Sequence, residues 1–375
     1  MKFKVMCIFT AILFCFSSGT IFAQPVNITI GTCGALTGSA SAYGESVVEG
    51  AILAVEELNK KGLRGLNATF KLISKDDEQT EVITSEEFTS LVYDENCLAV
   101  IGTTDSGCTH VAARTALKSK TPLIATVATD PSLSRLGNPY LFRNLADDLI
   151  QGFKLVEHIV NVKGHRNICI LHINTRYGKG GAKVVLDSSQ RLNARITMVE
   201  KYDRDQKEFK ALVEKVKRDR HDAMVIWGLY SEAAALVKEL KAAGVNSPIF
   251  APDGLATPAF IALAGDAANG VTVTWPFDSE MKATDPVVKS FVELYTREFG
   301  KEPDSFAAHA YDAVYLIAEA VVYGGPTREG VRRGLVFNKN FHGVSGVFSF
   351  DETGNSTLPV ELAIIEKGKF NMIRN

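Results

Sequence analysis

The chain has 375 residues, a length that predicts two domains of ordinary size. Hydrophobic residues make up 46% of it and charged residues 22%, a composition typical of globular proteins that excludes disorder, collagen and coiled coil. The formal net charge is -2, which gives no sign of a nucleic-acid partner, since such a partner needs a clustered basic excess.

The first 23 residues have the features of a secretory signal peptide. Lys2 and Lys4 form a basic start, residues 5–16 are almost wholly apolar, and Ala23 is the small residue expected at a cleavage site. The apolar run is short for a membrane span, and a buried N-terminal strand is the alternative interpretation. We therefore expect an exported, periplasmic protein that starts near Gln24.

The cysteines and histidines suggest no metal site. No Cys-x-x-Cys pair and no His-Glu-x-x-His motif occurs, so we expect neither a metal nor a cofactor. The mature chain is too long and too poor in cysteine for a disulfide framework. Cys33 and Cys108 each follow an expected strand of one lobe, and the sequence leaves open whether they form a disulfide or stay as buried thiols.

Strands and helices alternate through most of the chain. The expected strands cover residues 26–31, 70–74, 98–102, 122–126, 140–143, 167–172, 196–201, 223–227, 249–251 and 271–275. The expected helices cover residues 47–58, the acidic stretch up to Tyr93, 109–118, 149–162, 180–192, 209–217, 233–243 and a short segment around Phe260. Continuous apolar strands between helices indicate parallel sheets covered on both faces. The expected fold class is α/β, with two doubly wound Rossmann-like lobes.

The last hundred residues follow another pattern. Helices over 286–299 and 306–323 succeed each other without a strand, a short helix surrounds Val331, and 343–350 and 358–370 read as strands of a terminal hairpin-like segment. We expect the two helices to pack on the first lobe. The chain then crosses between lobes near Arg143, Pro276 and Gly346. The N-terminal lobe would hold 24–143 and 277–345, and the C-terminal lobe 144–276 and 346–375.

Ligands of open parallel sheets bind beyond the carboxyl ends of the strands. The loops at those ends contain no Gly-x-Gly-x-x-Gly sequence, no nucleotide P-loop and no Gly-x-Ser-x-Gly elbow. Ser106 has no histidine in a strand-end loop to activate it. We therefore expect no catalytic residues, and an enzyme that uses the cleft is the less favoured alternative.

The same loops do offer polar groups for a small ligand. Ser106 lies just before a helix, where its hydroxyl and the free N–H groups suit an anion, or where it merely caps the helix. Thr129 could bind a ligand or shape its turn. Asp253, between a proline and a glycine after an apolar strand, suits a cationic group, the alternative being an exposed turn carboxylate. Together these groups suit a zwitterion. Four aromatic residues either line the site or fill the core: Tyr43, Tyr177, Tyr230 and Phe306.

Seven segments, taken in order and spacing, resemble the periplasmic solute-binding proteins of the leucine/isoleucine/valine type, the type I receptors of ABC importers. They are Ile30-Gly31 with Ala35-Leu36-Thr37-Gly38 and Tyr43-Gly44, Val100-Ile101-Gly102 with Ser106, Thr129-Asp130-Pro131, Tyr177-Gly178, Pro252-Asp253-Gly254, Ala264 to Gly270, and Ala310-Tyr311-Asp312-Ala313. The resemblance implies two lobes that close on a ligand about a three-crossing hinge. It also implies a monomer that captures an amino acid, apolar or branched-chain, and delivers it to a membrane permease.

The resemblance also implies roles for individual residues. Ser106 takes the ligand carboxylate with backbone N–H help, and Val127, through its main chain, holds the head group with Thr129. Asp253, with the position near Tyr230, holds the α-ammonium, while Tyr43, Tyr177 and Phe306 surround the side chain. Two departures are visible: branched-chain binders carry Glu at the position of Asp253, and Thr104-Asp105 replaces an apolar-Cys pair. Relatives that bind amides, urea or aromatic acids, and chemosensory receptors, are the alternatives that this leaves open.

Overall fold

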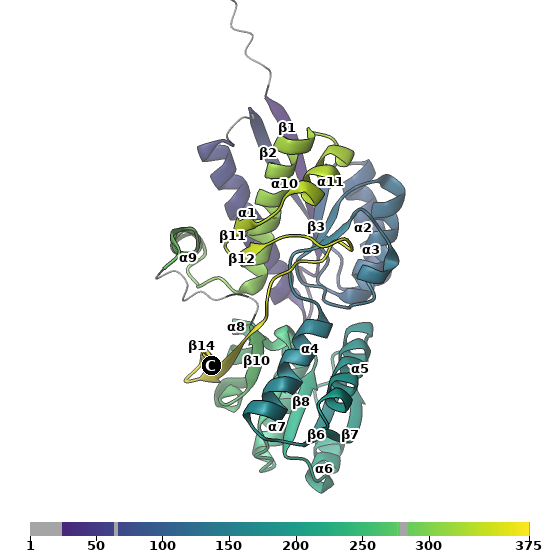
Figure 1. The fold of residues 1–375 in the computed structure, drawn as a ribbon, viewed down its shortest axis with the longest axis vertical. Coiled ribbons are helices and arrows are strands. Elements are labelled where there is room, and N and C mark those ends of the chain that lie inside the picture. The colour runs from purple at the N-terminus through teal and green to yellow at the C-terminus, as the bar shows by residue number, and fades with distance from the viewer. Residues whose placement is uncertain (1–24, 64–66, 276, 278–283, 375) are drawn as a thin grey trace, which may run out of the picture.

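The computed structural model describes residues 25–63, 67–275, 277 and 284–374, so the expected signal peptide lies outside the described residues. The described chain forms two lobes, one above the other in Figure 1, each built around a sheet with helices packed on it. This confirms the α/β class with two doubly wound lobes. Among the described residues no helix combines the length and the hydropathy needed to cross a bilayer.

The first lobe contains a five-stranded parallel sheet in the order β2-β1-β3-β4-β5. Its strands are β1 Val26–Gly34, β2 Ala68–Asp76, β3 Ala99–Gly102, β4 Leu123–Ala125 and β5 Leu141–Arg143. Its helices are α1 Ser41–Lys61, α2 Glu81–Tyr93, α3 Ser106–Ser119, the short η1 Ser134–Leu136, α9 Pro286–Phe299, α10 Ser305–Gly324 and α11 Arg328–Phe337. The late helices α9 to α11 pack with the first lobe, and α10 packs along α1.

Strands β3, β4 and β5 of this sheet are buried on both faces, which explains their continuous apolar runs. Along β3, Ala99 and Ile101 belong to the large core cluster that includes α1 and α10, whereas Val100 between them belongs to a separate cluster with α2 and α3. Alternate side chains of a strand point to opposite faces. The sheet is thus covered by α1 and α10 on one side and by α2 and α3 on the other.

The second lobe contains a seven-stranded sheet in the order β14-β13-β10-β9-β8-β6-β7. Five of its strands are parallel: β6 Asn167–Ile173, β7 Arg195–Tyr202, β8 Ala223–Trp227, β9 Ile249–Ala251 and β10 Thr272–Trp275. The antiparallel hairpin β13 Glu361–Glu366 and β14 Lys369–Met372 completes one edge. The helices are α4 Asp148–Glu157 with its π-helical continuation η2 His158–Val162, α5 Arg176–Arg191, α6 Lys210–Arg218, α7 Tyr230–Ala242, η3 Asp253–Leu255, α8 Pro258–Ala264 and η4 Gly265–Ala268.

Three helices begin three or four residues before their expected starts, at Ser106, Arg176 and Tyr230. The apolar periodicity used for the prediction appears only after the first turn, because that turn faces the space between the lobes and carries polar and small residues. Capping by Asp105 and Thr175 fixes two of these starts. The early turns bring residues of the candidate ligand site onto helices.

The C-terminal segment differs from the prediction of one hairpin-like pair. In place of one strand over 343–350 there is a tight hairpin, β11 Phe341–Gly343 with β12 Gly346–Phe348, and N–H groups of its turn donate to the Asp312 carboxylate of α10. Beyond it, the Arg143 N–H donates to the Gly354 carbonyl at 2.8 Å, which ties this stretch to β5. The third crossing therefore lies after Ser356 and before β13, and the boundary expected near Gly346 is too early.

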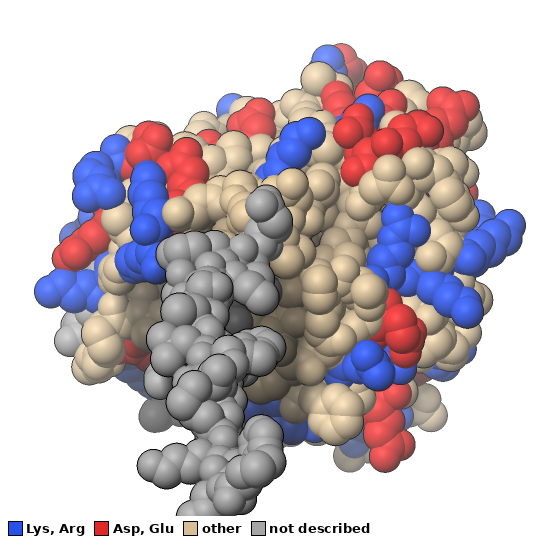
Figure 2. All heavy atoms as spheres, turned by 90° about the horizontal axis from the view of Figure 1, so that it is seen from above, with Lys and Arg blue, Asp and Glu red and all other residues tan. Residues whose placement is uncertain are grey.

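Acidic and basic side chains are interspersed on the end of the molecule formed by the first lobe (Figure 2). Neither sign gathers there into one continuous field on the described surface. The mixture of charges on this face is consistent with the nearly equal numbers of basic (41) and acidic (43) residues in the sequence.

Candidate functional site

A small cavity lies between the two lobes, at the carboxyl ends of both sets of parallel strands. Its walls are formed by Tyr43, Thr104, Asp105, Ser106, Val127, Ala128, Tyr177, Leu229, Asp253, Gly254 and Phe306. Six of the eight residues predicted for ligand binding are among them: Tyr43, Ser106, Val127, Tyr177, Asp253 and Phe306. The fold thus gathers residues more than 250 positions apart around one space.

Each lobe supplies one tyrosine from the first turn of a helix, and a glycine follows each of them. A Cβ built on Gly44 would lie 1.8 Å from the Ala35 carbonyl oxygen, and one on Gly178 would lie 1.9 Å from the Ile173 carbonyl oxygen. Only glycine allows these helix starts to pack so closely on the end of the preceding strand. The same local arrangement therefore places Tyr43 and Tyr177 on opposite walls of the cavity.

Tyr43 also joins the lobes directly. Its hydroxyl donates to the Gly254 carbonyl at 2.6 Å and accepts from the Tyr230 N–H at 3.2 Å, and both partners belong to the second lobe. The Tyr230 and Phe306 rings pack edge-on against the Tyr43 ring, with centroids 5.0 and 5.1 Å away. Tyr230 does not line the cavity; it lies behind Tyr43, and its hydroxyl accepts from the Ala42 N–H. The lobes are therefore in contact, in a closed arrangement.

The first-lobe wall is built around the start of α3. Asp105, not Ser106, caps this helix, since its Oδ1 accepts from the Gly107 N–H at 2.7 Å and from the Cys108 N–H at 3.2 Å. The Ser106 side chain is 2% exposed and faces the cavity. Among the described residues its hydroxyl has no hydrogen-bond partner, so it is available to a ligand.

The second-lobe wall presents the carboxylate of Asp253, which is only 2% exposed. Gln151 donates to its Oδ2 at 2.8 Å, and the Tyr177 hydroxyl donates to its Oδ1 at 3.4 Å. Burial raises the pKa of Asp253 to about 7, against the lowering effect of these two hydrogen bonds. No salt bridge to Asp253 occurs within the described part of the chain. The exposed-turn interpretation is therefore wrong, and the carboxylate faces the cavity without a cationic partner.

Sequence reasoning missed the residue that holds Asp253. Gln151 lies in the second turn of α4, its Oε1 accepts from the Asp253 N–H at 3.1 Å and from the Thr274 hydroxyl at 2.5 Å, and it is 1% exposed. The prediction considered only the loops at the carboxyl ends of parallel strands, and Gln151 lies on a helix that follows a hinge crossing. No sequence signal therefore pointed to this side chain. The other lining residues were also missed, although all of them except Thr104 adjoin a predicted residue: Thr104, Asp105, Ala128, Leu229 and Gly254.

Thr129 lies outside the cavity wall. Its carbonyl accepts from the Asp148 N–H at 3.0 Å, so its main chain meets the start of α4 just after the first crossing. Burial raises the pKa of Asp148 well above the ordinary value, and the nearby charge of Asp253 adds to the effect. The predicted contact between Thr129 and a ligand stays a prediction.

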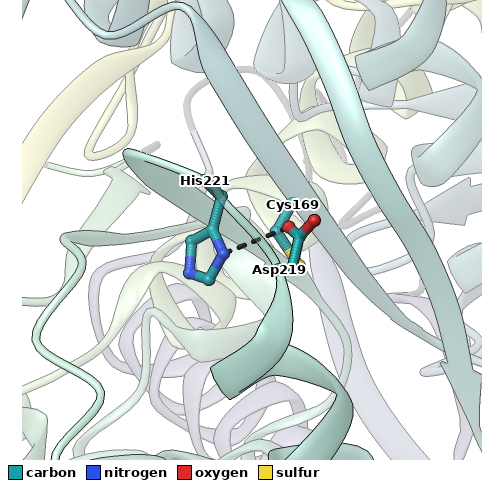
Figure 3. Close-up of side chains that lie close together, drawn as sticks. All are labelled: Cys169, Asp219 and His221. Carbon is teal, nitrogen blue, oxygen red and sulfur yellow. Dashed lines mark hydrogen bonds and ion pairs between the residues drawn. The ribbon is translucent and has the colours of Figure 1, made fainter.

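The four described cysteines are free and buried, so the Cys33–Cys108 disulfide is not formed. Cys169 lies close to Asp219 and His221 (Figure 3), near the amino ends of β6 and β8, whereas the cleft is at the carboxyl ends of these strands. One potential ligand atom from each lies within 4.8 Å of the others, a proximity that the sequence spacing did not reveal. The Asp219 carboxylate accepts from the Thr197 hydroxyl at 2.6 Å and pairs with His221 at 3.1 Å. These bonds account for the placement of the acid and the imidazole.

Comparison with known proteins agrees with this architecture. A model of the periplasmic binding protein family matches residues 27–369. The leucine-, isoleucine-, valine-, threonine- and alanine-binding protein of Pseudomonas aeruginosa is 27% identical over 346 residues, which cover 91% of this chain and 89% of that protein. The leucine-specific-binding protein of Salmonella typhimurium is 26% identical over 300 residues, 80% of each chain.

Solved structures show the same fold. The branched-chain amino acid transporter substrate-binding protein LivJ from Streptococcus pneumoniae, in complex with isoleucine, matches with a TM-score of 0.86 and 29% identity, covering 92% of this chain and 99% of that one. With the family model spanning both lobes and every cleft loop, the chain belongs to the periplasmic binding protein family.

Proposed function

We propose that this protein is the exported receptor of an ABC importer, which captures an amino acid in the cleft and delivers it to a membrane permease. The observation that carries the proposal is the polarity of the cavity. One wall presents a hydroxyl at a helix start and the other presents a buried acid, and neither has a neutralising or hydrogen-bonding cationic partner among the described residues. A buried charge is costly unless it is paired. A zwitterion of amino-acid size supplies the missing charge, and the relatives are named for ligands of this kind.

In this proposal each wall binds a different part of the ligand. The Ser106 hydroxyl and the first N–H of α3 face the carboxylate, with the Val127 main chain and Thr129 beside them. Asp253 receives the α-ammonium. Tyr43, Tyr177 and Phe306 enclose the side chain, and their rings favour an apolar one. The protein binds and releases its solute unchanged, and it acts as a monomer.

A panel of solutes tests the proposal. Amino acids, amides, urea and aromatic carboxylates are added separately to the mature protein, and thermal unfolding is followed. A ligand at a hundred times its Kd stabilises the native state by about 2.7 kcal/mol, so a true ligand stands out clearly. Mass spectrometry of the recovered solute checks that it is unaltered. Stabilisation by an amide or an aromatic acid and by no amino acid contradicts the proposal, as does sustained product formation.

Ligand is expected to shift the protein toward the closed form. The chain is expected to pass between the lobes three times, although the crossing expected near Pro276 lies outside the described residues. A ligand that contacts both walls favours the state in which the walls meet. Small-angle scattering should show a smaller radius of gyration when the ligand that stabilises the protein is added. An open ligand-free protein whose radius stays the same at saturation contradicts hinge closure.

Ser106→Ala is expected to weaken amino acid binding and leave the fold intact. The change removes one hydrogen bond to a charged group, which is about 1.5–3 kcal/mol, while the Asp105 cap that starts α3 is retained. Titration calorimetry measures the loss, and an unchanged unfolding temperature of the ligand-free variant serves as the control. A variant that binds as tightly as the parent protein removes Ser106 from the site.

A further inference from the structure

The anion side of the cleft carries an unexpected acid. Asp105 immediately precedes Ser106, and both line the cavity. A second acid, Asp77, is fully buried close by, and its pKa is raised to about 6 by burial, with the charge of Asp105 contributing. A ligand carboxylate at Ser106 therefore enters a region that already holds negative charge, and like charges at close range repel.

Both oxygens of the Asp105 carboxylate are occupied, by groups of different lobes. Oδ1 accepts from the N–H groups at the start of α3, within the first lobe. Oδ2 forms a salt bridge of 2.9 Å with Arg204, which follows β7 in the second lobe. The other arm of the guanidinium donates to the Gln79 carbonyl at 2.9 Å, again in the first lobe. Arg204 reaches these partners only because the lobes are in contact.

This salt bridge is partly shielded from water. The side chain of Asp105 is 10% exposed and that of Arg204 is 29% exposed. Beside it, the Ser39 hydroxyl donates to Asp205, the residue after Arg204, at 2.7 Å. The turn after β7 thus meets the first lobe at two neighbouring points. Because water is partly excluded there, the electrostatic interaction between Asp105 and Arg204 is stronger than it would be in open solvent.

We propose that Arg204 is a positioning residue that couples closure of the lobes to binding of the ligand carboxylate, by neutralising Asp105 when the cleft shuts. In the open form Asp105 faces the incoming anion without its cation. On closure Arg204 pairs with it, and the repulsion between Asp105 and the ligand falls. The inference rests on the proposed function, because it assumes an anionic group at Ser106.

The competing interpretation is a simple latch, in which the Arg204–Asp105 salt bridge stabilises the closed form whatever the ligand. The two interpretations differ in what happens when Asp105 alone loses its charge. Asp105→Asn keeps a good helix cap and removes the negative charge. The proposal expects this variant to bind the amino acid as tightly as the parent protein or more tightly. A latch expects it to bind more weakly, because the salt bridge is lost.

The experiment is a double-mutant cycle by titration calorimetry with the amino acid that binds best to the full mature protein. Arg204→Gln should weaken binding by roughly 5- to 150-fold, the usual range of coupling between sites. In the Asp105→Asn background the same change should lower the affinity less than about twofold, which is within the uncertainty of additivity. Lys207→Gln is the matched control, since it removes a positive charge from an exposed side chain of the same turn and should leave the affinity unchanged.

The α-carboxamide of the same amino acid provides a second test, because it lacks the ligand charge. Arg204→Gln should affect its binding far less than that of the acid. Equal losses for acid and amide, or weaker binding of the acid by Asp105→Asn, overturn the proposal in favour of a latch. If the amide does not bind measurably, the Asp105→Asn result alone decides. A parent protein that binds no amino acid at all contradicts the proposed function instead, so the two failures are distinguishable.

Discussion

Replacing Asp253 with alanine is expected to weaken binding of an α-amino acid by tens to thousands of fold. The carboxylate is buried, its hydrogen bonds come from Gln151 and Tyr177, and it faces the cavity. Truncating one partner of a buried charge pair costs about 2–5 kcal/mol, because the other charge is left unpaired, and each 1.4 kcal/mol is about tenfold in affinity. An exposed carboxylate would change binding by less than about 1 kcal/mol.

The measurement is a set of four titrations, with the amino acid and its deaminated analogue against the parent protein and Asp253→Ala. The deaminated analogue has no ammonium and gains nothing from Asp253, so its affinity should not fall in the variant. Asp266→Ala, which removes an exposed acid of the same lobe, is the control. A coupling energy near zero removes Asp253 from the site and favours a simple carboxylate or amide as the ligand.

Affinity for the amino acid is expected to fall about tenfold for each pH unit below about 7. In ligand-free protein whose lobes are in contact, burial raises the pKa of the Asp253 carboxyl to about 7, and it is this form to which the prediction applies. The ammonium needs the ionised carboxylate. Below this pKa, binding must first remove a proton, and a shift of one unit corresponds to about 1.4 kcal/mol. Above it, the affinity should be level until the ammonium itself titrates.

Stability of the ligand-free protein should respond in the opposite sense. Asp253 has a higher pKa in the folded chain than in the unfolded one, so the folded state binds more protons between about pH 4 and 7. The contribution of this group to stability therefore decreases as pH rises through that range. Titrations and thermal unfolding from pH 5 to 8 measure both trends, and Asp253→Asn should flatten the affinity profile. A parent protein whose affinity does not change between pH 5 and 7 contradicts the role given to Asp253.

The sequence predicted the parts of this molecule that depend on local pattern. Continuous apolar strands identified both parallel sheets, and the rule for strand ends led to Ser106 and Asp253 without knowledge of any contact. The contacts themselves depend on chain segments that are distant in sequence. Gln151 and Asp253 are 102 positions apart, and Arg204 and Asp105 are 99 apart, so no periodicity or spacing could pair them.

The early boundary at Gly346 has the same physical origin. An apolar run of eight residues reads as one strand, but the turn inside it is fixed by the Asp312 carboxylate, which accepts from the N–H groups of Val344 and Ser345. That acid lies more than 30 positions earlier, on α10. The hydrogen bonds to Asp312 therefore determine where the chain turns, and they attach the hairpin to the first lobe.

The direct contacts of Tyr43 with the second lobe bear on how long a solute stays bound. Its hydroxyl bridges the Gly254 carbonyl and the Tyr230 N–H across the cleft, and a ligand enclosed between the lobes leaves only when the cleft opens. Those bonds must break on every exit, yet they play no part in the encounter with the open form. Differences in affinity between related complexes are found mostly in the dissociation rate. The residence time of the solute is therefore set partly by hydrogen bonds that the solute does not make.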